Sequence, residues 1–177
     1  MRETVRVMIP EDDVNAKIRE LGIQISAAMD GQPLKLICIL KGSAFFACEL
    51  AKRITVPVTI DFMAVSSYGN ETESSGRVKI VKDVDDSVQG EHVLIVEDII
   101  DSGRTLSFLY GLFGRRGAAD VKICTLLDKP GRRVVDVPVD YRGFTIPDEF
   151  VVGYGLDYAQ RYRNLPYIGI LEFQEEE

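Results

Sequence analysis

Three apolar runs of strand length, each followed at once by a polar loop, constrain the fold of this chain more than any other feature. They are "LKLICIL" at 34–40, "HVLIVE" at 92–97 and "VKICTLL" at 121–127. Continuous apolar runs of this length are typical of strands that are covered on both faces. Helical patterns at 43–54 and 105–117 separate them. This alternation predicts an α/β fold, with a central, mostly parallel sheet flanked by helices and connected by right-handed crossovers.

Other segments predict further elements of the same domain. An amphipathic helix is expected at 10–29, and strands are expected at 56–65, 77–84, 150–155 and 167–173. The chain has neither an internal repeat nor a linker, so we expect one domain over residues 1–177. The side chains expected in the core are Val14, Ile18, Leu21, Ile25 and Ala28 of the first helix, Phe45, Leu50 and Ile54 of the second, and Val58, Ile60, Phe62 and Ala64 of the strand at 56–65.

Charge and composition narrow the class of partner. The net charge of -7 argues against nucleic acid, because phosphate binding usually leaves a basic footprint and the dense basic patches are confined to 114–117 and 129–133. The longest apolar runs are too short to cross a membrane. The N-terminal segment turns acidic where a signal peptide needs an apolar core, so a cytoplasmic protein is expected. Cys38, Cys48 and Cys124 lie in apolar contexts, which favours buried free thiols.

The single histidine limits the chemistry. His92 precedes an apolar run and is expected to have a structural or solvent-facing role. A histidine-rich zinc site is excluded, and a Ser-His-Asp triad has one possible centre. Any metal is therefore expected to be a hard cation on carboxylates, with Mg2+ as the first choice.

The segment "EDIIDSGRT" at 97–105 predicts an anion site. Ligands of open parallel sheets bind beyond the carboxyl ends of the strands, and residues 101–105 lie at such a strand-to-helix junction. The first N–H groups of a helix favour an anion, Gly103 allows close backbone approach, and Ser102 and Thr105 can donate hydroxyl hydrogen bonds. The alternative is a helix capped by Ser102, because neither standard nucleotide signature is present.

The acids of this segment favour a sugar phosphate over a simple cap. Glu97 and Asp98 are adjacent and cannot both point into an apolar core without a large cost. At a loop mouth they can hold ribose hydroxyls or a hydrated cation. Asp101 follows beside the anion site, where it can accept a proton near a reacting sugar carbon. Together these groups indicate a phosphorylated ribose.

The stretch "VLIVEDIIDSGRT" resembles the phosphoribosyl diphosphate (PRPP) motif of type I phosphoribosyltransferases, in the version found in hypoxanthine-guanine phosphoribosyltransferases. Four other segments resemble the family in order: "LKGS", "SSYG", "LLDKP" and "FVVGYGLDY" with "RYRNLP". The resemblance implies the type I phosphoribosyltransferase fold, with a small hood from the N-terminal and C-terminal segments. It also implies a flexible lid at about 66–76 and a homodimer or homotetramer.

The motif and the resemblance together define the expected site. The catalytic residues are Asp101, Lys129, which reads the purine 6-oxo group, and Arg163, which meets pyrophosphate. The metal candidates are Glu97, Asp98 and Asp157. The expected substrate-binding residues are Lys41, Gly42, Ser67, Tyr68, Glu97, Asp98, Asp101, Ser102, Gly103, Arg104, Thr105, Lys129, Phe150, Val151, Asp157 and Arg163.

The resemblance implies transfer of phosphoribose from Mg2+-PRPP to hypoxanthine or guanine. An Asp at position 101 is what the 6-oxopurine members carry. Within the enzyme class, the alternative is an enzyme that prefers xanthine. An RNA-binding regulator on the same fold is a second alternative, disfavoured by the net charge of -7 and by Asp101. A receiver domain is disfavoured because "LKLICIL" is followed by Lys-Gly and not by an acid pair.

Overall fold

The computed structural model describes residues 2–68 and 77–174. Its elements in chain order are β1 (Arg2–Ile9), α1 (Glu11–Met29), β2 (Leu34–Leu40), α2 (Ala44–Ala51), β3 (Val58–Tyr68), β4 (Arg77–Lys82), β5 (His92–Ile100), α3 (Arg104–Arg115), β6 (Asp120–Asp128), a 3-10 turn (Pro130–Arg132), β7 (Tyr141–Thr145), β8 (Val151–Val152) and β9 (Ile168–Gln174).

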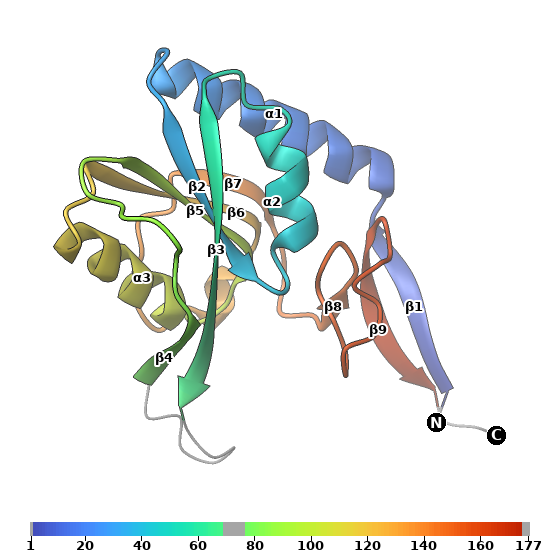
Figure 1. The fold of residues 1–177 in the computed structure, drawn as a ribbon. Coiled ribbons are helices and arrows are strands. Elements are labelled where there is room, and N and C mark those ends of the chain that lie inside the picture. The colour runs from blue at the N-terminus through green and yellow to red at the C-terminus, as the bar shows by residue number, and fades with distance from the viewer. Residues whose placement is uncertain (1, 69–76, 175–177) are drawn as a thin grey trace.

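The main sheet has the strand order β4-β3-β2-β5-β6-β7 (Figure 1). Every neighbouring pair is parallel except β3 and β4, which are antiparallel. The three apolar runs seen in the sequence form β2, β5 and β6, which are neighbours at the centre of the sheet. The expected α/β fold with a mostly parallel sheet is therefore confirmed.

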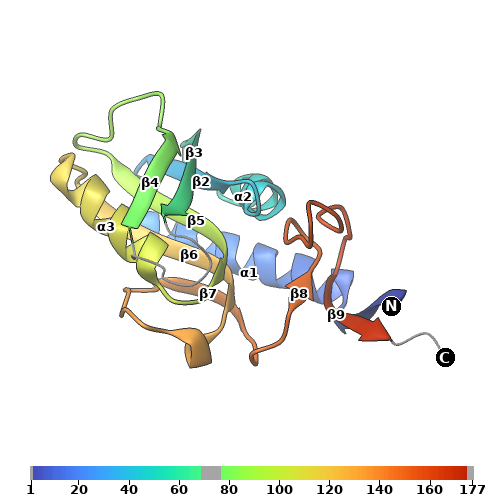
Figure 2. The ribbon, with the colours of Figure 1, turned by 90° about the horizontal axis from the view of Figure 1, so that it is seen from below.

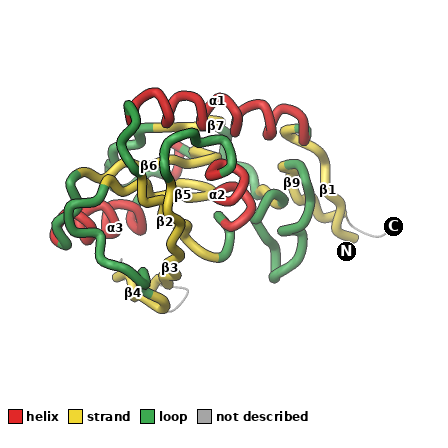
Figure 3. Tube along the Cα trace, turned by 45° about the horizontal axis from the view of Figure 1, so that its top comes forward, coloured by secondary structure: helices red, strands yellow, loops and turns green. Residues whose placement is uncertain are grey.

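Helices cover both faces of this sheet. Leu36 and Cys38 of β2 pack in one buried cluster with α1 and α2, whereas Ile37 and Ile39 pack in a second cluster with α3. Successive side chains of a strand point to opposite faces, so a strand buried on both sides is apolar throughout. Figure 3 shows α1 running along the main sheet and onward to β1.

A second, antiparallel sheet has the order β1-β9-β8 and forms the hood. It joins the two ends of the chain, with Val5 paired to Leu171 and Val151 paired to Ile170. Figures 1 and 2 place it at one end of the molecule, beside the start of α1. Ile168 and Val151 belong to the same buried cluster as α1, so the hood packs onto the main body. The expected hood from the chain ends is confirmed.

Several expected core positions were wrong. Ile60 and Phe45 are exposed, and Met63 and Phe46 are buried in their place. In β3 the buried side chains stand at the alternate positions to the ones expected. Both faces of this strand are partly covered, so the alternation of apolar residues does not identify one inward face. Ala28 is exposed near the end of α1. Cys48 is also exposed, so buried thiols are confirmed for Cys38 and Cys124 but not for Cys48.

The element boundaries also differ in places. β5 continues through Ile100 instead of ending at Glu97, and β8 contains two residues where a longer strand was expected. β1 and β7 were not expected from the sequence; their residues are partly exposed and lack a long apolar run. The first residues of the expected lid, 66–68, belong to β3, and residues 69–76 lie outside the described part of the chain. None of the described helices is long and apolar enough to cross a membrane.

Candidate active site

The site lies at the carboxyl edge of the main sheet. Parallel pairing of β2, β5 and β6 places the ends of these strands side by side. The loops that follow them carry Lys41, Asp101 and Lys129. The hood loop between β8 and β9 reaches the same edge, because Gly155 packs against Gly42. The four segments identified in the sequence within the described residues therefore converge.

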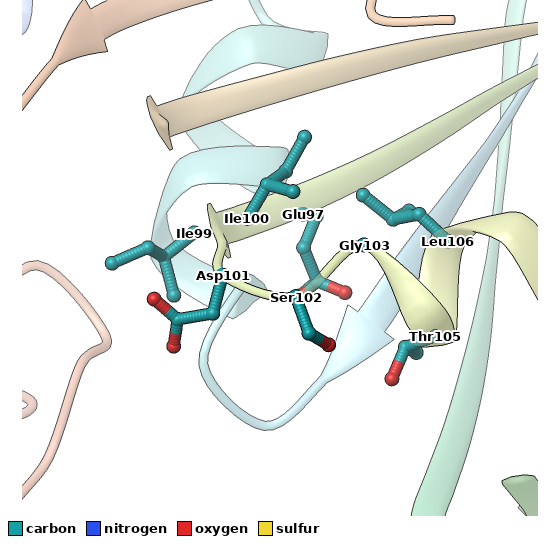
Figure 4. Close-up of a pocket in the computed structure, with 8 residues that line it drawn as sticks. All are labelled: Glu97, Ile99, Ile100, Asp101, Ser102, Gly103, Thr105 and Leu106. Carbon is teal, nitrogen blue, oxygen red and sulfur yellow. The ribbon is translucent and has the colours of Figure 1, made fainter. Parts of the chain in front are cut away.

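An anion cradle lies where β5 meets α3 (Figure 4). A cavity of about 290 Å³ is lined there by Glu97, Ile99, Ile100, Asp101, Ser102, Gly103, Thr105 and Leu106. Gly103 precedes α3 with a φ of 83°, a left-handed conformation that favours glycine. Arg104 N–H donates to Ser102 Oγ at 3.3 Å. The first N–H groups of α3 and the hydroxyls of Ser102 and Thr105 give this cavity the donors that a phosphate needs.

The two adjacent acids differ in exposure: Asp98 is buried, whereas Glu97 is partly buried and lines the cavity. Ser43 Oγ donates to Glu97 Oε1 at 3.0 Å and accepts the N–H of Asp98 at 3.0 Å. Burial and the neighbouring Asp98 charge raise the pKa of Glu97 well above its usual range. Burial likewise raises the pKa of Asp98, against the lowering effects of its hydrogen bonds with the Glu97 side chain and with backbone N–H groups, and of the Arg163 charge. Ser43 Oγ and the N–H groups of Asp98 and Ile99 already donate to the pair, and hydroxyl donors or a cation would further favour its charged form.

The loop after β2 is held very close to its neighbours. A Cβ atom at Gly42 would overlap the carboxylate of Asp98, and a Cβ at Gly155 would overlap the Gly42 carbonyl. The Leu40–Lys41 peptide bond is cis. Both glycines are therefore required by close contact, Gly155 also by its φ of 99°.

The two cations expected for pyrophosphate meet on one side chain. Gln160 Oε1 accepts from Lys41 Nζ at 3.2 Å and from an Arg163 Nη at 3.3 Å. Arg163 also donates to the Gly155 carbonyl at 2.6 Å and pairs with Asp157 at 3.1 Å. Its buried Nε has no hydrogen-bond partner among the described residues. This nitrogen is a buried donor that the present contacts of Arg163 leave unpaired.

The three metal candidates are not assembled. Within residues 2–68 and 77–174, no group of three or more His, Cys, Asp or Glu side chains is arranged to hold a metal ion. Asp157 instead accepts the N–H of Gln160 at 2.8 Å and pairs with Arg163. It therefore caps its own loop. The chemistry of Glu97 and Asp98 still fits Mg2+, because hard carboxylate oxygens are its preferred protein ligands and Glu97 lines the cavity at the start of α3.

The expected purine side brings Lys129 and Asp101 together. The Lys129 side chain is 9% exposed, and its Nζ lies 3.9 Å from the carboxylates of Asp101 and Asp148. Arg132 binds the same Asp148 oxygen at 3.0 Å. Lys129 is therefore held between two acids and is not a solvated turn lysine.

The stacking candidate belongs to an aromatic group. Phe150 is 52% exposed and meets the edge of Tyr158 at 5.8 Å between ring centroids. Tyr158 in turn contacts Phe173 at 5.5 Å. Val151 lies in β8, the last strand of its sheet, so part of its backbone faces away from β9. The Phe150 ring is therefore accessible to a planar ligand, whereas Val151 is buried.

Ser43, Asp148 and Gln160 belong to this site but were not predicted from the sequence. Ser43, which bridges the acid pair, stands inside "LKGS", and only its position in that loop indicates a role. Asp148 and Gln160 carry no signal of their own, since they are single polar residues in loops. Ser67 and Tyr68 form the end of β3. The remainder of the lid lies outside the described residues.

An α/β sheet with a phosphate cradle, an acid pair and opposed cations at its carboxyl edge defines a sugar-phosphate transferase. Residues 11–159 match the family described as Phosphoribosyl transferase domain. The chain is 54% identical to the hypoxanthine phosphoribosyltransferase of Salmonella typhimurium over 171 residues, which cover 96% of each chain. It superposes on the structure of a Staphylococcus aureus hypoxanthine phosphoribosyltransferase with a TM-score of 0.91 and 50% identity, over 94% of this chain and 91% of that one. The chain therefore belongs to the phosphoribosyltransferase family.

Some relatives are much longer than this chain. The chain is 58% identical to the bifunctional protein TilS/HprT of Listeria innocua over 167 residues. These cover 94% of the chain and 26% of that protein, so the chain spans about a quarter of it.

Proposed function

We propose that this protein transfers the 5-phosphoribosyl group from Mg2+-PRPP to N9 of hypoxanthine or guanine, giving IMP or GMP and pyrophosphate. The single observation that carries the proposal is the 3.9 Å approach of Lys129 to Asp101, beside the cavity at the start of α3. A purine reader and a proton acceptor then stand next to a phosphate cradle. The names of the relatives, hypoxanthine and hypoxanthine-guanine phosphoribosyltransferases, support the same reaction.

The proposed roles divide between the two sides of the site. On the ribose side, residues 101–105, Arg104 among them, hold the 5′-phosphate, and Glu97 and Asp98 orient the ribose hydroxyls. On the base side, Asp101 takes or shares the N7 proton as N9 attacks, and Lys129 donates to O6. Phe150 stacks on the base, and the Val151 backbone pairs with it.

The departing pyrophosphate is proposed to meet Lys41, the Gly42 backbone and Arg163, with Ser67 and Tyr68 closing over it. When bound, Mg2+ supplies positive charge that stabilises pyrophosphate as a leaving group. Glu97 and Asp98 would hold this ion or its waters, and Asp157 would join them only on releasing Arg163 and the Gln160 N–H. Arg163 must then exchange its contacts with Asp157 and Gln160 for the leaving group.

Selectivity against adenine follows from the chemistry of Lys129. An ammonium group only donates hydrogen bonds, and the 6-amino group of adenine offers donors where hypoxanthine has an acceptor. The unmade bond is expected to cost about 1–3 kcal/mol. The same reasoning does not rank xanthine, so an enzyme that prefers xanthine is the second candidate.

An RNA-binding regulator is less well supported. Arg116 pairs with Asp83, Arg132 with Asp148 and Arg133 with Asp128, so acids neutralise the basic patches of the sequence. We further propose a single phosphoribosyltransferase domain, a homodimer or homotetramer, and a cytoplasmic location.

Pyrophosphate release from Mg2+-PRPP tests the proposal, with hypoxanthine, guanine, xanthine and adenine offered separately. We expect release with hypoxanthine or guanine and little with adenine. Faster release with xanthine would favour the second candidate. Release with adenine alone, or equal release without any base, would contradict the proposal.

A further inference from the structure

The loop that follows Lys129 packs along the segment that carries Asp101. Lys129 N–H donates to the Ile100 carbonyl at 3.0 Å, which joins the two segments at their start. The N–H groups of Val134 and Val135 both donate to the Ser102 carbonyl, at 2.9 and 3.0 Å. The loop at 129–135, which is expected to bind the purine, therefore also supports the backbone of the phosphate cradle at 101–105.

Gly103 shows how tight this support is. A Cβ atom there would overlap the Val135 carbonyl and would lie 2.9 Å from Arg133 Cδ. Real Cβ atoms do not approach neighbours so closely, so residues 133–135 can pack here only against glycine.

The side chain of Arg133 connects this support to the backbone of Asp101. Its Nε donates to the Asp101 carbonyl at 3.2 Å, and an Nη of the same guanidinium binds Asp128 Oδ1. The planar guanidinium carries several donors in a rigid geometry, so anchoring one nitrogen orients the others. The Asp128 side chain is buried at the end of β6 and forms a firm anchor.

Arg142 offers a natural comparison. Its Nε binds the other oxygen of Asp128, Oδ2, at 2.7 Å. The Arg142 side chain is 47% exposed, whereas that of Arg133 is 17% exposed. Both arginines thus compensate one buried carboxylate, and of the two only Arg133 has a hydrogen bond to the segment of Asp101 among the described contacts.

We propose that Arg133 is a positioning residue for the transfer reaction. Through its bond to the Asp101 carbonyl it holds the Asp101–Ser102 backbone. This keeps the Asp101 carboxylate beside Lys129 and the cradle N–H groups aimed at one phosphate position. The inference rests on the proposed function and extends it, because Arg133 acts through Asp101 and Ser102 and touches neither the base nor the sugar phosphate.

The matched variants Arg133→Met and Arg142→Met test this role. Each removes one of the two partners of Asp128, and the methionine retains much of the apolar side-chain length. Steady-state kinetics with Mg2+-PRPP and hypoxanthine give kcat and KM, and thermal unfolding of the full chain gives Tm. For Arg133→Met we expect kcat to fall about 10- to 100-fold, the cost of misplacing a reacting group by about 1 Å. For Arg142→Met we expect kcat within about twofold of the wild type. We expect its Tm to change by about as much as that of Arg133→Met.

Arg133→Lys keeps the inference testable if the methionine variant does not fold. Lysine retains a charge for Asp128, but its single ammonium lacks the fork that reaches the Asp101 carbonyl as well. We expect a wild-type Tm and a kcat lowered by at least about tenfold, as estimated for a misplaced reacting group.

The outcomes separate the inference from the proposed function. Equal losses of kcat in Arg133→Met and Arg142→Met would show that both arginines only compensate Asp128, and would overturn the positioning role. A wild-type kcat in Arg133→Lys would overturn it as well. If the wild-type chain releases no pyrophosphate with any purine, the proposed function itself fails, and this inference with it.

Discussion

The floor of the site and its hood are built in opposite ways. On the floor, β5, β6 and their loops hold Lys129 and Asp98 largely buried, and backbone bonds join Lys129 to Ile100 and Val134 to Ser102. In the hood loop, Arg163 and Asp157 bind each other and Gln160, and the Phe150 ring is half exposed. The floor is therefore already shaped for its ligand, whereas the hood residues satisfy one another.

This difference indicates where binding must reorganise the protein. Groups fixed by buried contacts need no rearrangement when a ligand arrives, which is favourable for placing reacting atoms. Groups that are paired with each other must first separate, so ligand binding and partner exchange are coupled. We expect substitutions on the floor to lower turnover, and substitutions in the hood to change the affinity for PRPP and pyrophosphate.

The largest effect is expected for Asp101→Asn on the floor. The amide cannot accept the purine N7 proton, so kcat should fall about 10²- to 10⁴-fold, the usual contribution of a general base. KM for PRPP should change little, because the backbone of residues 101–105 still forms the cradle. Steady-state kinetics with hypoxanthine measure both constants. A rise in KM as large as the fall in kcat would instead assign Asp101 a structural role in the cradle.

The next largest effect is expected for Gly155→Ala, which breaks the contact between hood and floor. The methyl group would overlap the Gly42 carbonyl, and alanine would be strained at a φ of 99°. Together these should cost about 3 kcal/mol or more of unfolding free energy, or displace the Lys41–Gly42 loop. Urea unfolding and KM for PRPP report the two outcomes.

Gly114→Ala is the matched control for this substitution. Gly114 lies inside α3, and an added Cβ would meet nothing within 4 Å. Alanine should stabilise the helix by up to about 1 kcal/mol. A different result would be that Gly155→Ala keeps the wild-type unfolding free energy and the wild-type KM for PRPP. That result would show that the contact between Gly155 and Gly42 limits neither stability nor PRPP binding.

The same two regions explain what could be predicted from sequence. The floor strands are continuous apolar runs followed by polar loops, so β2, β5, β6 and the strand-to-helix junction at 101–105 could be predicted from local patterns. The contacts of Gly155 with Gly42, and of Gln160 with Lys41, join residues far apart in the chain, and no local pattern encodes them. Ile60 and Phe45 are exposed although their spacing predicted burial, because apolar side chains also occur singly on protein surfaces.

Glu97→Gln tests whether the charge of Glu97 destabilises the folded protein in the absence of a ligand. The pKa of Glu97 is raised in the folded protein, so the folded state binds more protons than the unfolded state above the ordinary value of 4.5. Stability should therefore fall as pH rises through the window between the ordinary and the raised pKa, and remain low above it. Glutamine removes this penalty, and at neutral pH it should raise the unfolding free energy by about 1–2 kcal/mol.

Urea unfolding at several pH values measures this effect for both proteins. The wild type should lose stability with rising pH above 4.5, and Glu97→Gln should lose less of it. Activity should fall even though stability rises, because the glutamine no longer offers a carboxylate to the ribose hydroxyls. A variant that is less stable than the wild type at neutral pH would mean that Ser43 and its neighbours already compensate the charge.

The smallest effect is expected for Gln160→Glu, which strengthens the bonds of residue 160 with Lys41 and Arg163. The neutral amide oxygen now accepts from both Lys41 and Arg163, and a carboxylate there would form charge-assisted bonds with the same two cations. Pyrophosphate must break these bonds, so KM for pyrophosphate and for PRPP should rise about three- to tenfold, which corresponds to roughly 1 kcal/mol. KM for hypoxanthine should not change, because the purine side of the floor does not contact Gln160.

Gln32→Glu controls for the added negative charge, since Gln32 lies exposed in the turn between α1 and β2. It should leave every kinetic constant within about twofold of the wild type, as expected for a screened surface charge. An equal rise in the KM values for PRPP and hypoxanthine in Gln160→Glu would indicate general damage to the loop. A selective rise in the PRPP and pyrophosphate values would show that the hood cations are released from Gln160 when the leaving group binds. The floor residues would then keep their contacts when the ligand binds, whereas the hood residues would exchange theirs for contacts with the leaving group.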